Sequence, residues 1–197
     1  MIHILTGTYA VFRPLDGRDT GPIELDLGCG KGRFTADLAA RYPDRSVYGA
    51  DLMIGRLRRL AKKAMNRGIA NLELLRAANL ELVAFQLPPG SVQRVHLLCP
   101  DPWPKERHRD KRLVTTDFLC RLCRVLVPGG VLHLATDHEP YFAHWQRMLA
   151  PLPFFVRDDT AIGDVADLQT DFELLWLQEG KTVQHMAFRY LPQAGDS

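Results

Sequence analysis

The sequence predicts an α/β fold in which helices cover both faces of a mostly parallel sheet. Short apolar runs alternate with helical patterns along the whole chain, and glycine or proline separates many of them. The segments between successive strands are long enough for crossover helices, as in βαβ units. The 197 residues, 46% hydrophobic and 24% charged, are typical of one globular domain.

The first half of the chain is predicted to contain three strand–helix pairs. The strands are the short apolar runs 23–27, 46–50 and 72–75, and the helices that follow them are 34–42, 54–66 and 79–85. Pro43 follows the first helix and cannot extend it, and Gly68 lies just past the end of the second, where a left-handed residue is common. The turn Pro88-Pro89-Gly90 comes after the third helix.

The second half is predicted to contain the remaining strands and helices. The strands are 92–98, 131–135, 154–156 and 183–190, and the helices are 115–126 and 140–149. The turn Pro128-Gly129-Gly130 ends the first of these helices. We expect a single domain over 1–197, with an N-terminal segment at 1–20 and a mobile polar loop at 157–169. A parallel sheet of this kind binds its ligand beyond the carboxyl ends of the strands.

Composition excludes several other classes of protein. The chain has no run of about 18 apolar residues, so no membrane span is predicted. Its N-terminus lacks the pattern of an export signal, and the cysteines are expected to be free thiols in a reducing cytoplasm. Cys120 and Cys123 form one CxxC without a second pair, and His138 and His144 lack the spacing of metal ligands on a helix. We therefore expect no metal.

The charge is distributed unevenly, although the net charge is only +2. Six basic residues lie between positions 56 and 67 without an acid among them. A second basic block covers 105–112, diluted by Glu106 and Asp110. Such blocks hold a polyanion locally even on a nearly neutral protein, or they are solvated faces of helices.

A glycine-rich turn follows the first predicted strand. Gly28, Gly30 and Gly32 form GxGxG, whereas the dinucleotide fingerprint GxGxxG needs another glycine where Arg33 stands. This spacing argues against a nicotinamide cofactor and favours a cofactor without a pyrophosphate. Asp51 ends the second strand and is expected to accept hydrogen bonds from both ribose hydroxyls.

The turn and this acid together resemble the class I S-adenosylmethionine-dependent methyltransferases. Asn79, just after the third strand, is expected to meet the adenine edge. The resemblance implies a Rossmann-like sheet of seven strands, the last of them antiparallel, in agreement with the seven strands predicted above.

The fourth strand leads into a block rich in proline and in charge. It reads Pro100-Asp101-Pro102-Trp103-Pro104-Lys105 and continues through Arg107, His108 and Arg109 to Lys111-Arg112-Leu113. This block resembles PDPWPKxRHxKRRL, the signature of the tRNA (guanine-N7-)-methyltransferase family. Two further segments are similar to the family's TD…Y and TxFE…G stretches, namely 135–141 and 170–173 with Gly180 after it.

The resemblance implies that the chain transfers a methyl group from S-adenosyl-L-methionine to N7 of guanine 46 in the variable loop of tRNA. The implied methyl-donor site consists of Glu24, Gly28, Gly30, Asp51, Asn79 and Asp101, and Asp101 is also the implied catalytic residue. The implied contacts of the acceptor nucleotide are Lys105, Asp137, Thr170, Asp171, Phe172 and Glu173. The implied contacts of the tRNA backbone are Arg107, His108, Arg109, Lys111 and Arg112. We expect no obligatory protein partner, and a monomer or homodimer.

The chain departs from the family pattern at several positions. Asp51 stands where Glu is usual, which shortens the reach to the ribose, and Asn79 stands where Asp is common, which removes a charge. Asp110 dilutes the basic run, and the chain begins about 20 residues before its first strand, without the longer basic extension of some members. These differences concern tRNA affinity more than fold or chemistry.

Two alternatives remain open on the sequence alone. One is a class I methyltransferase that acts on a small molecule or on another nucleobase. The basic block at 105–112 argues against the small-molecule version. The other is a catalytically silent RNA-binding module, and the acids Glu24, Asp51, Asp101, Asp137 and Glu173 argue against it.

Overall fold

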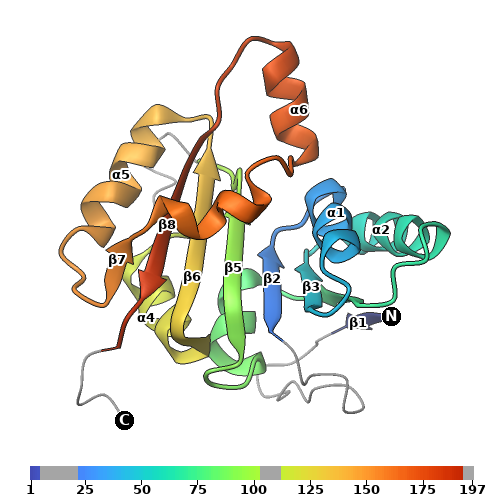
Figure 1. Ribbon diagram of the computed structural model, residues 1–197, viewed down its shortest axis with the longest axis horizontal. Coiled ribbons are helices and arrows are strands. Elements are labelled where there is room, and N and C mark those ends of the chain that lie inside the picture. The colour runs from blue at the N-terminus through green and yellow to red at the C-terminus, as the bar shows by residue number, and fades with distance from the viewer. Residues whose placement is uncertain (5–21, 103–111, 193–197) are drawn as a thin grey trace.

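One sheet of eight strands forms the centre of the computed structural model, which describes residues 1–4, 22–102 and 112–192 (Figure 1). The strands are β1 (Ile2–Ile4), β2 (Ile23–Leu27), β3 (Ser46–Ala50), β4 (Leu72–Arg76), β5 (Val92–Leu98), β6 (Leu126–Thr136), β7 (Phe155–Arg157) and β8 (Gln184–Tyr190). Their order in the sheet is β1-β4-β3-β2-β5-β6-β8-β7. β8 is antiparallel to both of its neighbours, and the other pairs are parallel. The predicted α/β fold with a last antiparallel strand is confirmed.

Helices cover both faces of this sheet. The helices are α1 (Arg33–Arg41), α2 (Ile54–Asn66), α3 (Asn79–Glu81), a π-helix (Leu82–Gln86), α4 (Thr116–Val125), α5 (Glu139–Leu149), a 3₁₀ helix (Asp159–Val165) and α6 (Asp171–Gln178). On one face α1, α2 and the 3₁₀ helix pack on a buried cluster that includes Phe34, Leu57 and Ile162. On the other face α4, α5 and the π-helix pack on a second cluster that includes Phe118 and Trp145. Burial of these apolar faces is the main force that holds the layers together.

Strand β1 is additional to the seven predicted strands, because residues 1–20 were expected to be an N-terminal segment before the first strand. It pairs with β4 in parallel, and His3 Nε2 lies 3.0 Å from Glu73 Oε2. Three residues at a sheet edge are too few to show a periodic pattern, so only the pairing reveals this strand.

β6 is longer than predicted and continues through Pro128-Gly129-Gly130. The register on β5 moves from Val92 opposite Leu126 to Arg94 opposite Val131, so the predicted turn is a bulge in the ladder. Gly129 has φ +79°, a conformation that glycine adopts without strain.

The segment 157–169, predicted to be a mobile loop, contains the 3₁₀ helix and packs onto the sheet. Ile162 and Val165 are buried. Asp164 Oδ1 accepts a hydrogen bond from Arg94 Nη1 at 2.7 Å, and Asp167 Oδ1 accepts one from Arg41 Nη1 at 2.6 Å. Asp164 and Asp167, which make this segment look solvated in the sequence, are thus partners of arginines on other elements.

Candidate active site

A cavity of about 510 Å³ opens at the carboxyl ends of β2, β3 and β5. Of the residues that the structure describes, those that line it come from six parts of the chain: 26–34, 51–56, 78–80, 97–101, Leu113 and 170–172. Its volume is in the range of small-molecule and cofactor sites. Figure 1 shows α6 beyond the edge at which these strands end, so the start of α6 forms part of the rim. The position agrees with the expectation for a parallel sheet.

The glycine turn forms the floor of the cavity and is held by backbone hydrogen bonds. The N–H groups of Gly28 and Cys29 both donate to the carbonyl of Ala50, at 2.8 and 2.9 Å. Gly30 has φ +57° and Gly32 has φ +74°, both in the left-handed region. A Cβ on Gly32 would lie only 2.4 Å from a methyl of Leu60. The tight turn therefore requires glycine, and it exposes bare backbone to a ligand.

Asp51, predicted to bind the cofactor, lies directly beside this turn. Its Oδ2 accepts a hydrogen bond from the N–H of Gly30 at 3.1 Å, and its Oδ1 accepts one from the N–H of Met53 at 2.7 Å. Arg56 Nη1 lies 3.4 Å from Oδ2. The carboxylate is thus fixed in orientation, and it retains acceptor sites for a ligand in the cavity. Asn79 lines the same cavity, and with Asp101 the structure brings together five of the six predicted donor-site positions.

The predicted donor site is corrected at Glu24, which does not line this cavity. It lies near the amino end of β2 and is fully buried. Its carboxylate accepts hydrogen bonds from Arg94 Nε at 2.8 Å and from Arg45 Nη1 at 2.6 Å. Burial favours a higher pKa, but hydrogen bonds from His96 and Arg94 together with the charge of Arg94 outweigh it and hold the pKa well below its ordinary value. Glu24 is therefore an ionised partner of two arginines inside the fold.

Asp26, two residues after Glu24 on β2, lines the cavity and was not among the predicted site residues. Side chains two residues apart share a face of a strand, and Asp26 is nearer the carboxyl end of β2. It is 3% exposed and accepts a hydrogen bond from Thr35 Oγ1 at 2.6 Å. Burial raises its pKa to about 7 despite that hydrogen bond, and the charges of Asp51 and Glu173 raise it further. Its position just before Leu27 and the glycine turn is the sequence signal that identifies it.

Asp101, the predicted catalytic residue, lies at the rim beyond the carboxyl end of β5. The preceding Cys99 has φ 54°, which is uncommon for a residue other than glycine, and its N–H donates to the carbonyl of Ala135 at 2.8 Å. Burial raises the pKa of the Cys99 thiol, and Glu173, Asp137 and Asp26 also raise it. Cys99 is thus a neutral thiol near several carboxylates, and its unusual backbone turns the chain toward Pro100 and Asp101.

The predicted acceptor segment 170–173 forms the first turn of α6. Its Thr170 and Glu173 make a capping box: Thr170 Oγ1 accepts from the N–H of Glu173 at 3.1 Å, and the Glu173 carboxylate accepts from the N–H of Thr170. Thr170, Asp171 and Phe172 line the cavity, while Glu173 is buried behind them. The structure thus brings this segment to the same cavity as Asp101.

Of the predicted RNA contacts, the structure describes Arg112 alone, which lines a small neighbouring hollow with Pro102, His138 and Arg147. Lys105, Arg107, His108, Arg109 and Lys111 lie outside the described residues. Within the described ranges, no group of three or more His, Cys, Asp or Glu side chains is arranged to hold a metal ion. The helices in those ranges include none with the length and apolar character needed to cross a membrane.

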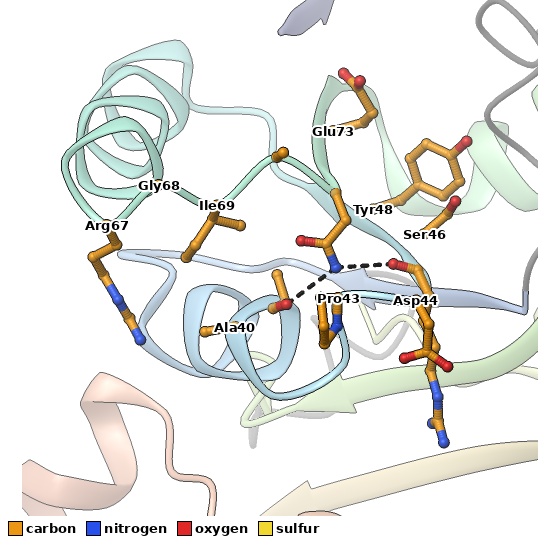
Figure 2. Close-up of a pocket in the computed structure, with 13 residues that line it drawn as sticks. Ala40, Pro43, Asp44, Ser46, Tyr48, Arg67, Gly68, Ile69 and Glu73 are labelled. Atoms are coloured by element: carbon orange, nitrogen blue, oxygen red, sulfur yellow. Dashed lines mark hydrogen bonds between the residues drawn. The ribbon is translucent and has the colours of Figure 1, made fainter.

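A second cavity, of about 500 Å³, lies at the amino ends of β3 and β4 (Figure 2). Asn71 forms part of its wall, and its side-chain amide donates to the carbonyls of Ala39, Tyr42 and Arg45 at 3.0, 2.8 and 2.9 Å. These bonds join the end of α1 to the start of β4. This hollow is at the end of the sheet opposite the glycine turn, so we place the candidate active site in the first cavity.

Comparison with known proteins identifies the family. The family described as "Putative methyltransferase" matches residues 20–186. The chain is 35% identical over 178 residues to the tRNA (guanine-N(7)-)-methyltransferase of Halorhodospira halophila, covering 87% of this chain and 76% of that one. It is 32% identical over 182 residues to the enzyme of the same name from Paracidovorax citrulli, covering 89% and 73%.

The chain belongs to the tRNA (guanine-N(7)-)-methyltransferase family.

Another member of the family, from Thermus thermophilus, is 37% identical over 174 residues. The match covers 88% of this chain but only 55% of that relative, so the chain spans about half of its length. Among solved structures, the 16S rRNA methyltransferase KamB superposes with a TM-score of 0.66 at 19% identity, covering 88% of this chain and 90% of that one. A SAM-dependent methyltransferase from Aquifex aeolicus gives 0.58 at 15% identity, covering 89% and 85%. At these identities the likeness shows the fold, which is the class I methyltransferase fold predicted from the sequence.

Proposed function

We propose that this chain transfers a methyl group from S-adenosyl-L-methionine to N7 of guanine 46 in the variable loop of tRNA. The observation that carries the proposal is one cavity lined by the glycine turn, Asp51, Asp101 and the segment 170–172, in a member of this family. A donor site and an acceptor site must meet for direct transfer, and one cavity lined by both sets of residues satisfies this requirement.

The residues of the cavity fit the methyl donor. Its volume of about 510 Å³ is sufficient for a nucleoside carrying an amino acid. Asp51 retains carboxylate acceptors for ribose hydroxyls. Asp26 has a hydroxyl partner in Thr35 but no ion-pair partner among residues 1–4, 22–102 and 112–192. A buried carboxyl with a raised pKa is stabilised in its charged form by a cation, and the donor carries both a sulfonium and an ammonium group.

The chemistry needs alignment and charge stabilisation more than a base. The bound donor supplies an electrophilic methyl group on a positively charged sulfur. Guanine N7 has an in-plane lone pair and no proton, so no residue has to remove one before attack. In our proposal Asp101 accepts hydrogen bonds from the N1–H and the amine of guanine, with Asp137 and Glu173 nearby. Fixed carboxylates would orient the base and stabilise the positive charge that develops on it.

The proposed tRNA contacts come from the basic block. Arg107, His108, Arg109, Lys111 and Arg112 follow Asp101 in the sequence, so phosphates held by them would lie near the acceptor base. The four cysteines are free, which agrees with activity in the cytoplasm. A monomer or homodimer without an obligatory partner stays our expectation.

The test is transfer of labelled methyl from S-adenosyl-L-methionine to an unmodified tRNA transcript, with the modified nucleotide mapped. We expect one 7-methylguanosine per transcript, and none on a matched transcript in which guanine 46 is replaced by adenine. Labelling at another position or another atom would contradict the assignment. Titration calorimetry separates the alternatives, because a silent RNA-binding module would bind tRNA but not the donor, and a small-molecule methyltransferase would bind the donor but not tRNA.

A further inference from the structure

A row of hydrogen-bonded side chains crosses the sheet and ends at the candidate active site. His96 Nε2 lies 2.9 Å from Glu24 Oε2, and His96 Nδ1 lies 3.0 Å from His133 Nδ1. His133 Nε2 lies 3.0 Å from His185 Nδ1, and His185 Nε2 lies 2.9 Å from Glu173 Oε1. Two carboxylates are thus connected by three imidazoles in series, with Glu173 at the end nearest the cavity.

The strand order explains why the row is continuous. β2, β5, β6 and β8 are successive neighbours in the sheet, and each contributes one member. His96 and His133 are direct partners in the parallel register, and His185 pairs with Ala135, two residues beyond His133. Side chains two residues apart point to the same face, so all the members meet on one side of the sheet. Phe34 of α1 packs edge-on against His96, at 4.8 Å between ring centroids, and helps to exclude water.

The row needs one proton more than three neutral imidazoles supply. Each of its four contacts needs one hydrogen between the two heavy atoms. A neutral imidazole carries one N–H, and an ionised carboxylate carries none. Three neutral rings therefore satisfy three contacts and leave the fourth with two facing lone pairs. One ring must be an imidazolium, or one carboxyl must be protonated.

The Glu24 end of the row does not hold the extra proton. Glu24 is paired with Arg94 and Arg45, and its pKa lies well below its ordinary value for the reasons given above. His96 is fully buried, and burial lowers its pKa even though Glu24 acts in the opposite direction. The proton therefore belongs to the other half of the row.

Among His133, His185 and Glu173, which form the other half of the row, His185 holds the extra proton. His133 is buried between two other imidazoles, and burial together with the charges of His185 and Arg94 lowers its pKa well below the ordinary value. Burial favours a higher pKa for Glu173, but hydrogen bonds from His185 and from Thr170 outweigh it, so Glu173 is ionised. The side chain of His185 is 32% exposed, which leaves water to solvate a charge, and it touches the Glu173 carboxylate directly.

We propose that His185 is a positioning residue, held as an imidazolium by the donor count of the row, which fixes Glu173 and with it the first turn of α6. The groups that the structure pairs with His185 are Glu173 from α6 and His133 from β6. Through the capping box, a fixed Glu173 also fixes Thr170, which lines the cavity. The charge assignment stands on the row alone, and only its effect on methyl transfer rests on the proposed function.

The charge is tested by ¹⁵N NMR of the histidine rings at pH 7 in the whole chain. We expect both ring nitrogens of His185 to be protonated, and one nitrogen each of His96 and His133. The variant His133→Phe keeps a ring but removes both ring nitrogens, so only the contacts of His96 with Glu24 and of His185 with Glu173 remain, and two neutral imidazoles supply their hydrogens without the extra proton. The ratio of doubly to singly protonated His185 should then fall about tenfold, the scale of one hydrogen bond to a charged group.

His3 is the matched control, because its Nε2 lies 3.0 Å from Glu73 Oε2 and, among the residues that the structure describes, no histidine is in hydrogen-bond contact with it. Its protonation should not change in His133→Phe. A singly protonated His185 in the unsubstituted chain would overturn the proposal, and so would an unchanged ratio in a folded His133→Phe variant. The spectrum of the unsubstituted chain decides the matter even if the variant does not fold.

The positioning role is tested by single-turnover methylation of tRNA. His185→Gln retains N–H donors but removes the charge, and it should lower the rate about tenfold or more through misplacement of α6. His185→Lys retains both the charge and donors for His133 and Glu173, and it should restore most of the rate. Equal rates in the two variants would overturn the role of the charge. If the unsubstituted chain does not methylate tRNA, the proposed function fails while the NMR result still decides the protonation of His185.

Discussion

Replacing Asp26 by asparagine should stabilise the protein at high pH. Burial raises the pKa of Asp26 to about 7, from an ordinary value of 3.8. The folded protein therefore binds this proton over a range of pH in which the unfolded chain has released it. The stabilisation from the neutral carboxyl is complete below pH 3.8 and is lost as the pH rises toward 7. Asparagine is neutral at every pH and retains an oxygen that can accept from Thr35.

The magnitude follows from the span between the two pKa values. Each pH unit is equivalent to about 1.4 kcal/mol, so the span of about three units makes ionised Asp26 unfavourable by about 4 kcal/mol. Between pH 5 and pH 8 we expect the difference in free energy of unfolding, variant minus unsubstituted chain, to rise by about 3 kcal/mol. Other titrating groups are common to both proteins and cancel in this difference.

The assay is urea unfolding of both proteins at pH 5 and at pH 8. Asp44→Asn is the control, since Asp44 is exposed and its substitution should give the same difference at both pH values. If the difference for Asp26→Asn is also the same at both pH values, burial does not raise the pKa of Asp26 and our reasoning about this carboxyl is refuted.

Four further predictions concern the proposed reaction and the buried charges. Asp51→Ala should weaken donor binding by about 1–3 kcal/mol in titration calorimetry, because hydrogen bonds to a carboxylate are lost, and unchanged affinity would remove Asp51 from the site. Glu24→Gln should leave donor affinity unchanged but lower the free energy of unfolding in urea by about 3–5 kcal/mol, since buried arginines lose their partner; weaker donor binding in a stable variant would return Glu24 to the site. Asp101→Asn should lower the single-turnover rate about 10²-fold with tRNA binding nearly unchanged, and an unchanged rate would exclude an electrostatic role. Arg107→Ala with Arg112→Ala should flatten the salt dependence of tRNA binding by about one charge each, and an unchanged slope would show that neither touches phosphate.

Local patterns predicted most of the elements because their signals lie within one segment. The strands at 46–50 and 92–98 and the helix at 54–66 have the predicted bounds. α6 was missed as a helix because its apolar side chains do not face a core: Leu175 and Leu177 are exposed, and the only buried residue is Glu173. Its capping box is the one local signal that marks its start.

The candidate site could be predicted in part for a similar reason. Parallel strands bring their carboxyl ends to one edge, so Gly28, Asp51 and Asn79 could be placed together from their positions after strands. Glu24 and Asp26 share a face of β2, and the sequence pattern did not show which of them reaches that edge. The difference depends on where the strand ends relative to its neighbours, which is a property of the sheet.

The sequence by itself determined the α/β class, the ends of most elements and the family, because apolar periodicity, turn residues and motifs are all local. Only the tertiary structure decided which charges meet. Arg94 donates hydrogen bonds to Glu24 and Asp164, each 70 residues away in the sequence. His96, His133 and His185 form a row because their strands are neighbours in the sheet. Hydrogen bonds and ion pairs act over a few ångströms in space, so their partners are set by strand order and register, which no single segment contains.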